Sequence, residues 1–260
     1  MARLLSPLDR FPYTLLLILG LGLLMSCQNS PNSFSDKDVF RYNEFRNVTS
    51  LDPAFARNPQ NIWPVNQIFN GLVQLDHRLE VQPDIAKAWT LSEDGLEYRF
   101  HLRDDVFFHE SPFFGPDKTR KVVAADFVFS FDRLRDSKLA APGGWVMQNV
   151  HSYKAIDQHQ LLIRLRKPFP AFLGLLSMRY CSVVPEEVVT RLGAKFRSHP
   201  IGTGPFRFQF WEEDVKLVLR KNPLFFEKDS LGHPFPISKQ LPFNSFPIFK
   251  ASLCSFYRGK

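Results

Sequence analysis

The stretch "SHPIGTGPFRF", Ser198–Phe208, concentrates control of the backbone just before a predicted strand. Gly202 and Gly204 permit backbone angles that other residues avoid, and Pro205 fixes its own φ and disfavours helix before it. A phosphate-binding loop is excluded, because the sequence lacks the Gly-Lys-Ser/Thr ending and the helix that follows it. Two interpretations of the segment Gly202, Thr203, Gly204 and Pro205 stay open, a structural turn and a crossing between domains.

The composition indicates a folded protein without a nucleic-acid partner. The chain has 260 residues, 44% of them apolar, which is enough for a core in one large or two smaller domains. The formal net charge is +7. However, basic residues without any acid follow Pro236, and Arg3 and Arg10 outnumber Asp9 near the start. The body between them is therefore nearly balanced, without the footprint of a nucleic-acid-binding surface.

The first residues resemble an export signal. The apolar run Leu15–Met25 follows two arginines, and it is shorter than the about 20 residues of a membrane-spanning helix. It ends in "LLMSC", which resembles the lipobox of bacterial lipoproteins, whose cysteine is lipidated. We therefore predict a lipoprotein signal peptide over 1–26, a lipidated Cys27 and a flexible polar tether over 27–38. An uncleaved anchor or an ordinary signal is the alternative.

The body mixes strands and helices without a strict repeat. Apolar residues alternate in Tyr98–Leu102 and Leu161–Leu165, which predicts strands. They recur at helical spacing in Val123–Leu134, and Pro185–Gly193 carries helix start and stop signals. Further predicted elements are a strand at Val39–Tyr42, a helix ending at Gly71, a buried strand around Cys181, and a hairpin with Phe206, Phe208 and Phe210 on one face. The class is α/β with a mixed sheet.

Eight segments of this body stand in the order found in one family. They are "SLDP", "QIFNGLVQLD", "QPDIAKAWTLSEDGLEYRFHLRDDVFFHE", "AADFVFSFDRLRDS", "PFPAFLGLL", "VVPEEVV", "GTGPFRF" and "LRKNPLFFEKD". Together they cover roughly Val39 to Gly232. With these segments the chain resembles the family 5 extracellular solute-binding proteins of ABC transporters, the oligopeptide, dipeptide and nickel group.

The resemblance implies a receptor with the class II periplasmic-binding-protein-like fold. Such a protein captures a peptide or similar small solute in a cleft and passes it to an ABC transporter permease. A lipid anchor would hold it at the membrane, on the periplasmic face of the cell envelope. The resemblance implies neither a cofactor nor enzymatic activity, and it gives Gly202–Pro205 a structural role where the chain returns from the second lobe to the first.

The family order also implies domain boundaries. Residues 39–75 begin lobe I, 76–194 form lobe II, 195–236 return to lobe I, and 237–260 form an aberrant tail. Family members are about twice as long and continue into a third lobe, so we expect a frameshifted or truncated receptor whose third lobe is missing. Marginal stability, exposed apolar surface and little peptide affinity would follow. A divergent but genuine tail is the alternative.

The resemblance offers few ligand contacts. Asn43 and Glu44 follow the first strand, where family members line the cleft, and Glu44 is placed to meet a peptide amine. Trp145 matches the segment whose aromatic residue reaches the ligand from lobe II. A solvated loop carboxylate and a packed surface tryptophan are the alternatives. No catalytic residue and no metal site is predicted, because His101 and His109 stand too far apart along a strand to share a metal and no G-x-S-x-G motif is present. A peptide-sensing surface lipoprotein or a non-functional remnant is the other interpretation of the function.

Overall fold

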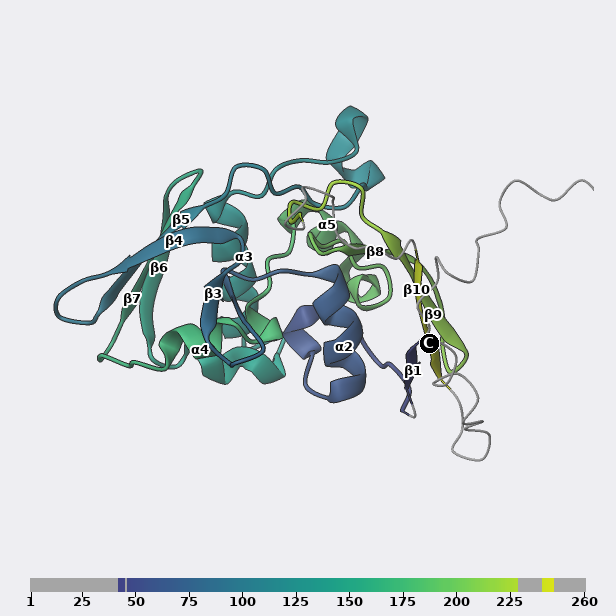
Figure 1. Cartoon of the computed structure of the whole chain (residues 1–260), viewed down its shortest axis with the longest axis horizontal. Coiled ribbons are helices and arrows are strands. Elements are labelled where there is room, and N and C mark those ends of the chain that lie inside the picture. Colours follow the sequence, from purple (N-terminus) through teal and green to yellow (C-terminus); the bar gives the residue numbers. More distant parts are fainter. Residues whose placement is uncertain (1–41, 45, 229–239, 246–260) are drawn as a thin grey trace, which may run out of the picture. The chain divides into compact units, whose positions relative to one another are not determined.

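The computed structural model describes residues 42–44, 46–228 and 240–245 (Figure 1). Within these residues the strands form two four-stranded sheets and one two-stranded sheet. Short 3-10 segments connect many of the elements, at Pro53–Phe55 (η3), Pro112–Asp117 (η4), Pro142–Met147 (η5), Arg179–Cys181 (η6) and Gly193–Arg197 (η7). The sheets are mixed with helices, as predicted for the α/β class.

One sheet is antiparallel throughout, and we call it the β4–β7 sheet. Its strands lie in the order β4 (Ala86–Leu91), β5 (Glu97–Leu102), β7 (Gln160–Leu165) and β6 (Val150–Asp157). Every second residue of β5 is buried, and the same alternation holds in β7. Both strands were predicted from this pattern, and the structure confirms them. One face of the sheet is therefore apolar and the other is polar.

Helix α3 (Ala124–Arg135) packs along the apolar face of the β4–β7 sheet (Figure 1). Phe127, Phe131 and Leu134 are buried there, which confirms the helix predicted from their spacing. Arg120 fixes the start of α3 by donating to Asp126 and also to Glu187 on the neighbouring helix. Burial favours loss of the proton from Arg120, but the hydrogen bonds that Arg120 donates to Glu187 and Asp126 outweigh this effect and raise its pKa.

The second four-stranded sheet is mixed, and we call it the β1–β8 sheet. Its order is β1 (Tyr42–Glu44), β10 (Gln240–Ser245), β9 (Lys216–Lys221) and β8 (Phe206–Glu212). β1 and β10 are parallel, whereas the other neighbours are antiparallel. β10 lies within residues 237–260, the expected aberrant tail, where no strand was predicted because Pro242 and the lack of alternation gave no strand signal.

The remaining helices and strands are short. They are α2 (Pro59–Ile68), β2 (Val73–Leu75), β3 (Val81–Pro83), α4 (Phe172–Leu176) and α5 (Glu186–Leu192). Helix α2 ends before the predicted Gly71, because the chain there turns into β2, which pairs with β3. Helix α5 confirms its prediction, with two glutamates in its first turn and Gly193 at its end. No described helix has the length and apolarity needed to cross a membrane.

The buried apolar side chains form two clusters. The β4–β7 core contains the inner faces of the β4–β7 sheet and α3, and apart from Ala54 its members run from Leu72 to Val183. The β8–β9 core contains residues of α2, α5, β8 and β9, and its members run from Val48 to Phe69 and from Val184 to Leu219. The chain thus crosses between the cores near residues 70 and 183. The domain boundaries given above stay predictions.

Two local predictions are wrong. A β-bulge between Phe208 and Phe210 shifts the register of the β8–β9 hairpin, so Phe206 is buried while Phe210 is 40% exposed. The three phenylalanines therefore do not share one buried face. Cys181 lies in the 3-10 segment η6 rather than in a strand, although it is buried as expected, and burial raises the pKa of its thiol to about 12.

Candidate functional site

The segment Gly202–Pro205, here called the return segment, lies against the end of helix α2. The amide of Gly204 donates to the carbonyl of Ile68 at 2.8 Å. A Cβ atom on Gly202 would stand 2.1 Å from the Ile68 oxygen, and one on Gly204 would stand 2.5 Å from the Gln67 oxygen. Neither glycine has a positive φ. The two glycines are thus needed for close backbone approach, and the sequence-based reason, unusual backbone angles, is wrong.

Thr203 joins the return segment to both crossings between the cores. Its buried hydroxyl donates to Asn70 Oδ1 at 3.0 Å and accepts from the Asn70 amide at 3.2 Å. The Asn70 carbonyl in turn accepts from the amide of Val183 at 3.0 Å. Three passes of the chain, near residues 70, 183 and 203, are therefore hydrogen-bonded at one place.

Asp84 extends this arrangement on the other side of Asn70. Its carboxylate accepts from Asn70 Nδ2 at 2.9 Å and from the Gly71 amide at 3.1 Å. Burial raises the pKa of Asp84 to about 7, against the opposing effects of the Arg179 charge and of these hydrogen bonds. The protonation state of this buried carboxyl group therefore changes near neutral pH.

The imidazole ring of His109 contacts both glycines of the return segment. The side chain is only 2% exposed. Nε2 lies 2.9 Å from the Gly204 oxygen, and Nδ1 lies 3.3 Å from the Gly202 amide, which donates to it. A neutral ring with its proton on Nε2 satisfies both contacts. Burial lowers the pKa of His109 to about 4, in agreement with this neutral form.

Asn222, just after β9, completes the set. Its Nδ2 donates to the Gly204 oxygen at 2.9 Å, and its amide donates to the Pro205 oxygen at 2.8 Å. We call Asn70, Asp84, His109, Thr203 and Asn222 the junction network. All five are buried, and each polar contact joins segments distant in sequence.

Trp145 lies in η5, on the surface, with 47% of its area exposed. Its neighbours Gly144 and Met147 line a pocket of about 380 Å³, together with Arg135 and Arg166. Trp145 itself is not part of that lining. Asp136 also lines this pocket, and no described contact joins the Trp145 indole to the two arginines.

The other predicted site residues are not brought to this region by any described contact. Asn43 and Glu44 lie in β1, where they pair with Asn244 and Ser245 of β10. Trp145, by contrast, belongs to η5, which packs against α3 and η3. Cys27 lies outside the described residues. Whether Asn43, Glu44 and Trp145 share one ligand stays a prediction.

Most of the junction network could not be recognised from the sequence. Asp84, Asn70 and Asn222 occur in segments that carried the family resemblance, but no local pattern marked them as partners of the return segment. His109 was considered only as a metal ligand on a strand shared with His101. It lies instead beyond the end of β5, where the chain has left the sheet.

Comparisons with known proteins identify the family to which this chain is similar. Residues 80–234, more than half of the chain, match the family described as "Bacterial extracellular solute-binding proteins, family 5 Middle". The probable di/tripeptide-binding protein 5 of Pseudomonas aeruginosa (strain UCBPP-PA14) is 33% identical over 221 residues, which are 78% of this chain and 39% of that protein.

Solved structures of periplasmic binding proteins are also similar to this chain. The periplasmic binding protein DppA of Helicobacter pylori, in complex with the peptide STSA, is 26% identical with a TM-score of 0.71 over 80% of this chain and 43% of that one. NikZ of Campylobacter jejuni, in complex with Ni(L-His), is 26% identical with a TM-score of 0.69 over 82% of this chain and 40% of that one.

The chain therefore spans about two fifths of the length of these relatives, and its mixed α/β fold matches the corresponding part of periplasmic peptide-binding proteins. Proteins of this family bind solutes and are not enzymes. The family match over residues 80–234 shows that the chain belongs to the bacterial extracellular solute-binding proteins, family 5.

Proposed function

We propose that the protein binds short peptides as the receptor of an ABC transporter. The observation that carries this proposal is the 33% identity to a probable di/tripeptide-binding protein over 78% of the chain. A structural relative with 26% identity holds the peptide STSA. Extended peptides are bound through their backbone and charged ends, while roomy pockets accept varied side chains.

The described surface offers groups suited to this ligand. Trp145 presents an exposed apolar ring, and Arg135 and Arg166 in the adjacent pocket suit a carboxylate. Glu44 would meet the peptide amine if β1 and η5 face a common ligand. On this proposal Trp145 contacts the bound peptide.

Calorimetric titration of the 260-residue protein with di-, tri- and tetrapeptides tests the proposal. Trp145→Ala should weaken binding about tenfold, since a well-packed aromatic contact is worth roughly 1–2 kcal/mol. Trp63→Ala in α2 is the matched control, because Trp63 is about as exposed as Trp145, at 49%, but lies in a different element and away from the pocket beside Trp145. Absence of binding to every peptide would contradict the proposal and agree with the incomplete-receptor prediction. Equal losses in the two variants would remove Trp145 from the site.

A nickel chelate is the second candidate ligand, because NikZ holds Ni(L-His) at 26% identity to this chain. The same titration with nickel and histidine together, and with each alone, separates the two candidates. Binding of the mixture but of no peptide would assign the protein to chelate uptake.

We also propose that the receptor is a lipoprotein that delivers its solute to a permease. The lipobox-like "LLMSC" supports cleavage before Cys27, and multiple acyl chains would give a stable anchor, since one chain alone binds membranes marginally. Mass spectrometry of the protein from its native membrane tests this proposal. An unmodified Cys27 in the mature protein, or recovery of that mature protein entirely in the aqueous fraction, would contradict it.

A further inference from the structure

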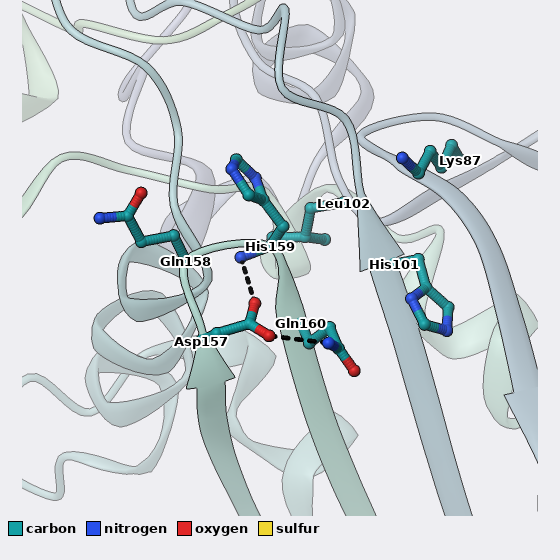
Figure 2. A pocket seen from close by; sticks show the side chains of 7 residues that line it. All are labelled: Lys87, His101, Leu102, Asp157, Gln158, His159 and Gln160. Carbon is teal, nitrogen blue, oxygen red and sulfur yellow. Dashed lines mark hydrogen bonds between the residues drawn. The ribbon is translucent and has the colours of Figure 1, made fainter.

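A second pocket, of about 480 Å³, lies at the edge of the β4–β7 sheet and is not used by the proposed function (Figure 2). It is lined by Lys87 of β4, His101 and Leu102 of β5, and residues 157–160, which end β6, form the turn and begin β7. None of these residues lines the pocket beside Trp145. The pocket is therefore a separate feature of the surface.

The sheet register explains why these side chains gather. His101 pairs with Gln160, and Gln160 pairs with Asp157, so the three form a row across adjacent strands. The pairing of β4 with β5 shifts between Ala86 and Ala88, which makes Lys87 the extra residue of a bulge beside His101. Bulges redirect side chains and are common next to binding sites.

The turn that closes the pocket is held by its backbone. The carbonyl of His159 accepts from the Leu102 amide at 2.8 Å, and the carbonyl of Gln158 accepts from the Ala124 amide at 2.9 Å. Figure 2 shows Asp157 bonded within the turn: Oδ1 accepts from the His159 amide and Oδ2 from Gln160 Nε2, both at 2.7 Å. The carboxylate of the pocket is thus already engaged by local donors.

The cationic and imidazole groups are not engaged in the same way. Among the described residues, Lys87 and His101 have no side-chain hydrogen bond or ion pair, and the buried Nδ1 atom of His159 has no partner. The described residues also contain no group of three or more His, Cys, Asp or Glu placed to hold a metal ion. An ammonium and an imidazole without described protein partners, with the nearby carboxylate satisfied, favour a negatively charged oxygen ligand.

We infer that this pocket binds an oxyanion, a carboxylate or phosphate group of a small solute, through Lys87 and His101, with the ring of His159 beside them. The inference does not depend on the proposed peptide function, because the two sites share no residue. The pocket is large enough to admit a solute that carries such a group as well as the group itself.

Amide NMR of the intact protein, titrated separately with inorganic phosphate and with malonate, tests the inference. Resonances of residues 158–160 should shift, and Lys87→Gln should weaken binding about tenfold, as expected for loss of one charge-assisted contact. Lys154→Gln is the matched control: Lys154 is an exposed lysine on the same polar face of the sheet, opposite Leu162. It should change the affinity less than about twofold, because Lys154 does not line the pocket and an exposed charge away from the ligand contributes little.

The outcomes are distinct. Binding of phosphate alone or of malonate alone supports the site and identifies the group it prefers, and binding of both supports the oxyanion class. Absence of shifts in residues 158–160 with both probes overturns the inference. Equal weakening by Lys87→Gln and Lys154→Gln also overturns it, because the effect would then be one of overall charge. The spectra themselves report whether each variant is folded.

Discussion

Gly204 is one of the two glycines of the return segment at which a larger side chain would meet backbone atoms. A Cβ atom there would stand 2.5 Å from the Gln67 oxygen and 2.6 Å from the Ile68 carbonyl carbon, both backbone atoms that cannot rotate away. Gly204→Ala should therefore reduce the free energy of unfolding by about 1–3 kcal/mol, the usual cost of overpacking. Gly204→Val should cost more.

Gly174 provides the control for that substitution. It lies in helix α4, and a Cβ atom there would have no neighbour within 4 Å. Gly174→Ala should leave stability unchanged or raise it by up to about 1 kcal/mol, because alanine favours helix. Urea unfolding measures both variants. Equal stability of Gly204→Ala and the wild type would show that the return segment can move away from α2.

His109 should make the protein less stable in acid. Its pKa is about 4 in the folded protein and 6.5 ordinarily, chiefly because burial disfavours the charged ring. Below pH 6.5 His109 binds a proton in the unfolded chain but stays neutral in the folded protein. The free energy of unfolding therefore decreases as the pH falls from 6.5 to 4. The loss amounts to up to roughly 3 kcal/mol. Above pH 6.5 this contribution is fully present.

Comparison of the wild type with His109→Gln isolates this effect. Asp84 acts in the opposite direction, because its raised pKa favours the folded state as the carboxyl group takes up a proton. That contribution is present in both proteins and cancels in the difference. The unfolding free energy of the wild type should fall more steeply between pH 6.5 and 4 than that of His109→Gln. Parallel curves would mean that His109 is protonated in the folded protein.

The ion pair between η3 and α3 links two elements that the sequence places far apart. Arg133 donates to Asp52 through both terminal nitrogens, at 2.6 and 3.2 Å, and the two side chains are 11% and 7% exposed. Asp52 also caps η3 by accepting from the Ala54 amide. Arg133→Gln should lower the unfolding free energy by about 3 kcal/mol, because it leaves a buried carboxylate without its partner.

A surface pair supplies the comparison. Arg164 lies 3.6 Å from Glu97, with side chains 51% and 37% exposed. Arg164→Gln should change stability by less than about 1 kcal/mol, since exposed pairs contribute little and are screened by salt. If the two variants lose the same stability in urea unfolding, the Asp52–Arg133 pair is not a structural link between η3 and α3.

Elements with a regular apolar pattern could be predicted from the sequence. β5, β7 and α3 each bury one face against a core, so the burial requirement appears directly as a period of two residues or of a helical turn. α5 was predicted instead from its start and stop signals. β10 carries a proline and no alternation, and the bulge in β8 inserts one residue without a local signal. These features depend on the partner strand, which the sequence of one segment does not contain.

Less of the candidate site could be predicted. The family resemblance pointed to Trp145, which is exposed, and its contact with a ligand stays a prediction. The junction network could not be derived, because its contacts join residues 70 and 203 or 109 and 204. The oxyanion pocket likewise depends on the register of three strands. Hydrogen bonds over such separations are set by tertiary packing.

The chain as a whole has two cores that meet at the junction network. The β4–β7 core is continuous in sequence apart from Ala54, whereas the β8–β9 core is assembled from segments on both sides of it. A discontinuous core of this kind folds only when its distant segments meet. Hydrogen bonds of Thr203, Asn70 and Val183 join those segments, so the junction should transmit unfolding from one core to the other.

Thr203→Val should therefore uncouple the two cores. The substitution keeps the side chain's shape but leaves the buried Asn70 amide and Oδ1 without the hydroxyl, at a cost of about 1–3 kcal/mol. Trp89 packs against the β4–β7 core and Trp211 against the β8–β9 core, so proteins that retain only one of these tryptophans report on one core each. With Thr203 present, the two urea transitions should coincide.

In the Thr203→Val proteins the Trp211 transition should move to lower urea than the Trp89 transition, because only the discontinuous core depends on the junction to bring its segments together. Thr90→Val is the control, since Thr90 is an exposed residue on β4, and it should leave both transitions together. If the two transitions stay coincident in Thr203→Val with unchanged midpoints, the junction does not couple the cores. If they already differ with Thr203 in place, the cores unfold independently, and the hydrogen bonds around Asn70 only fix local geometry.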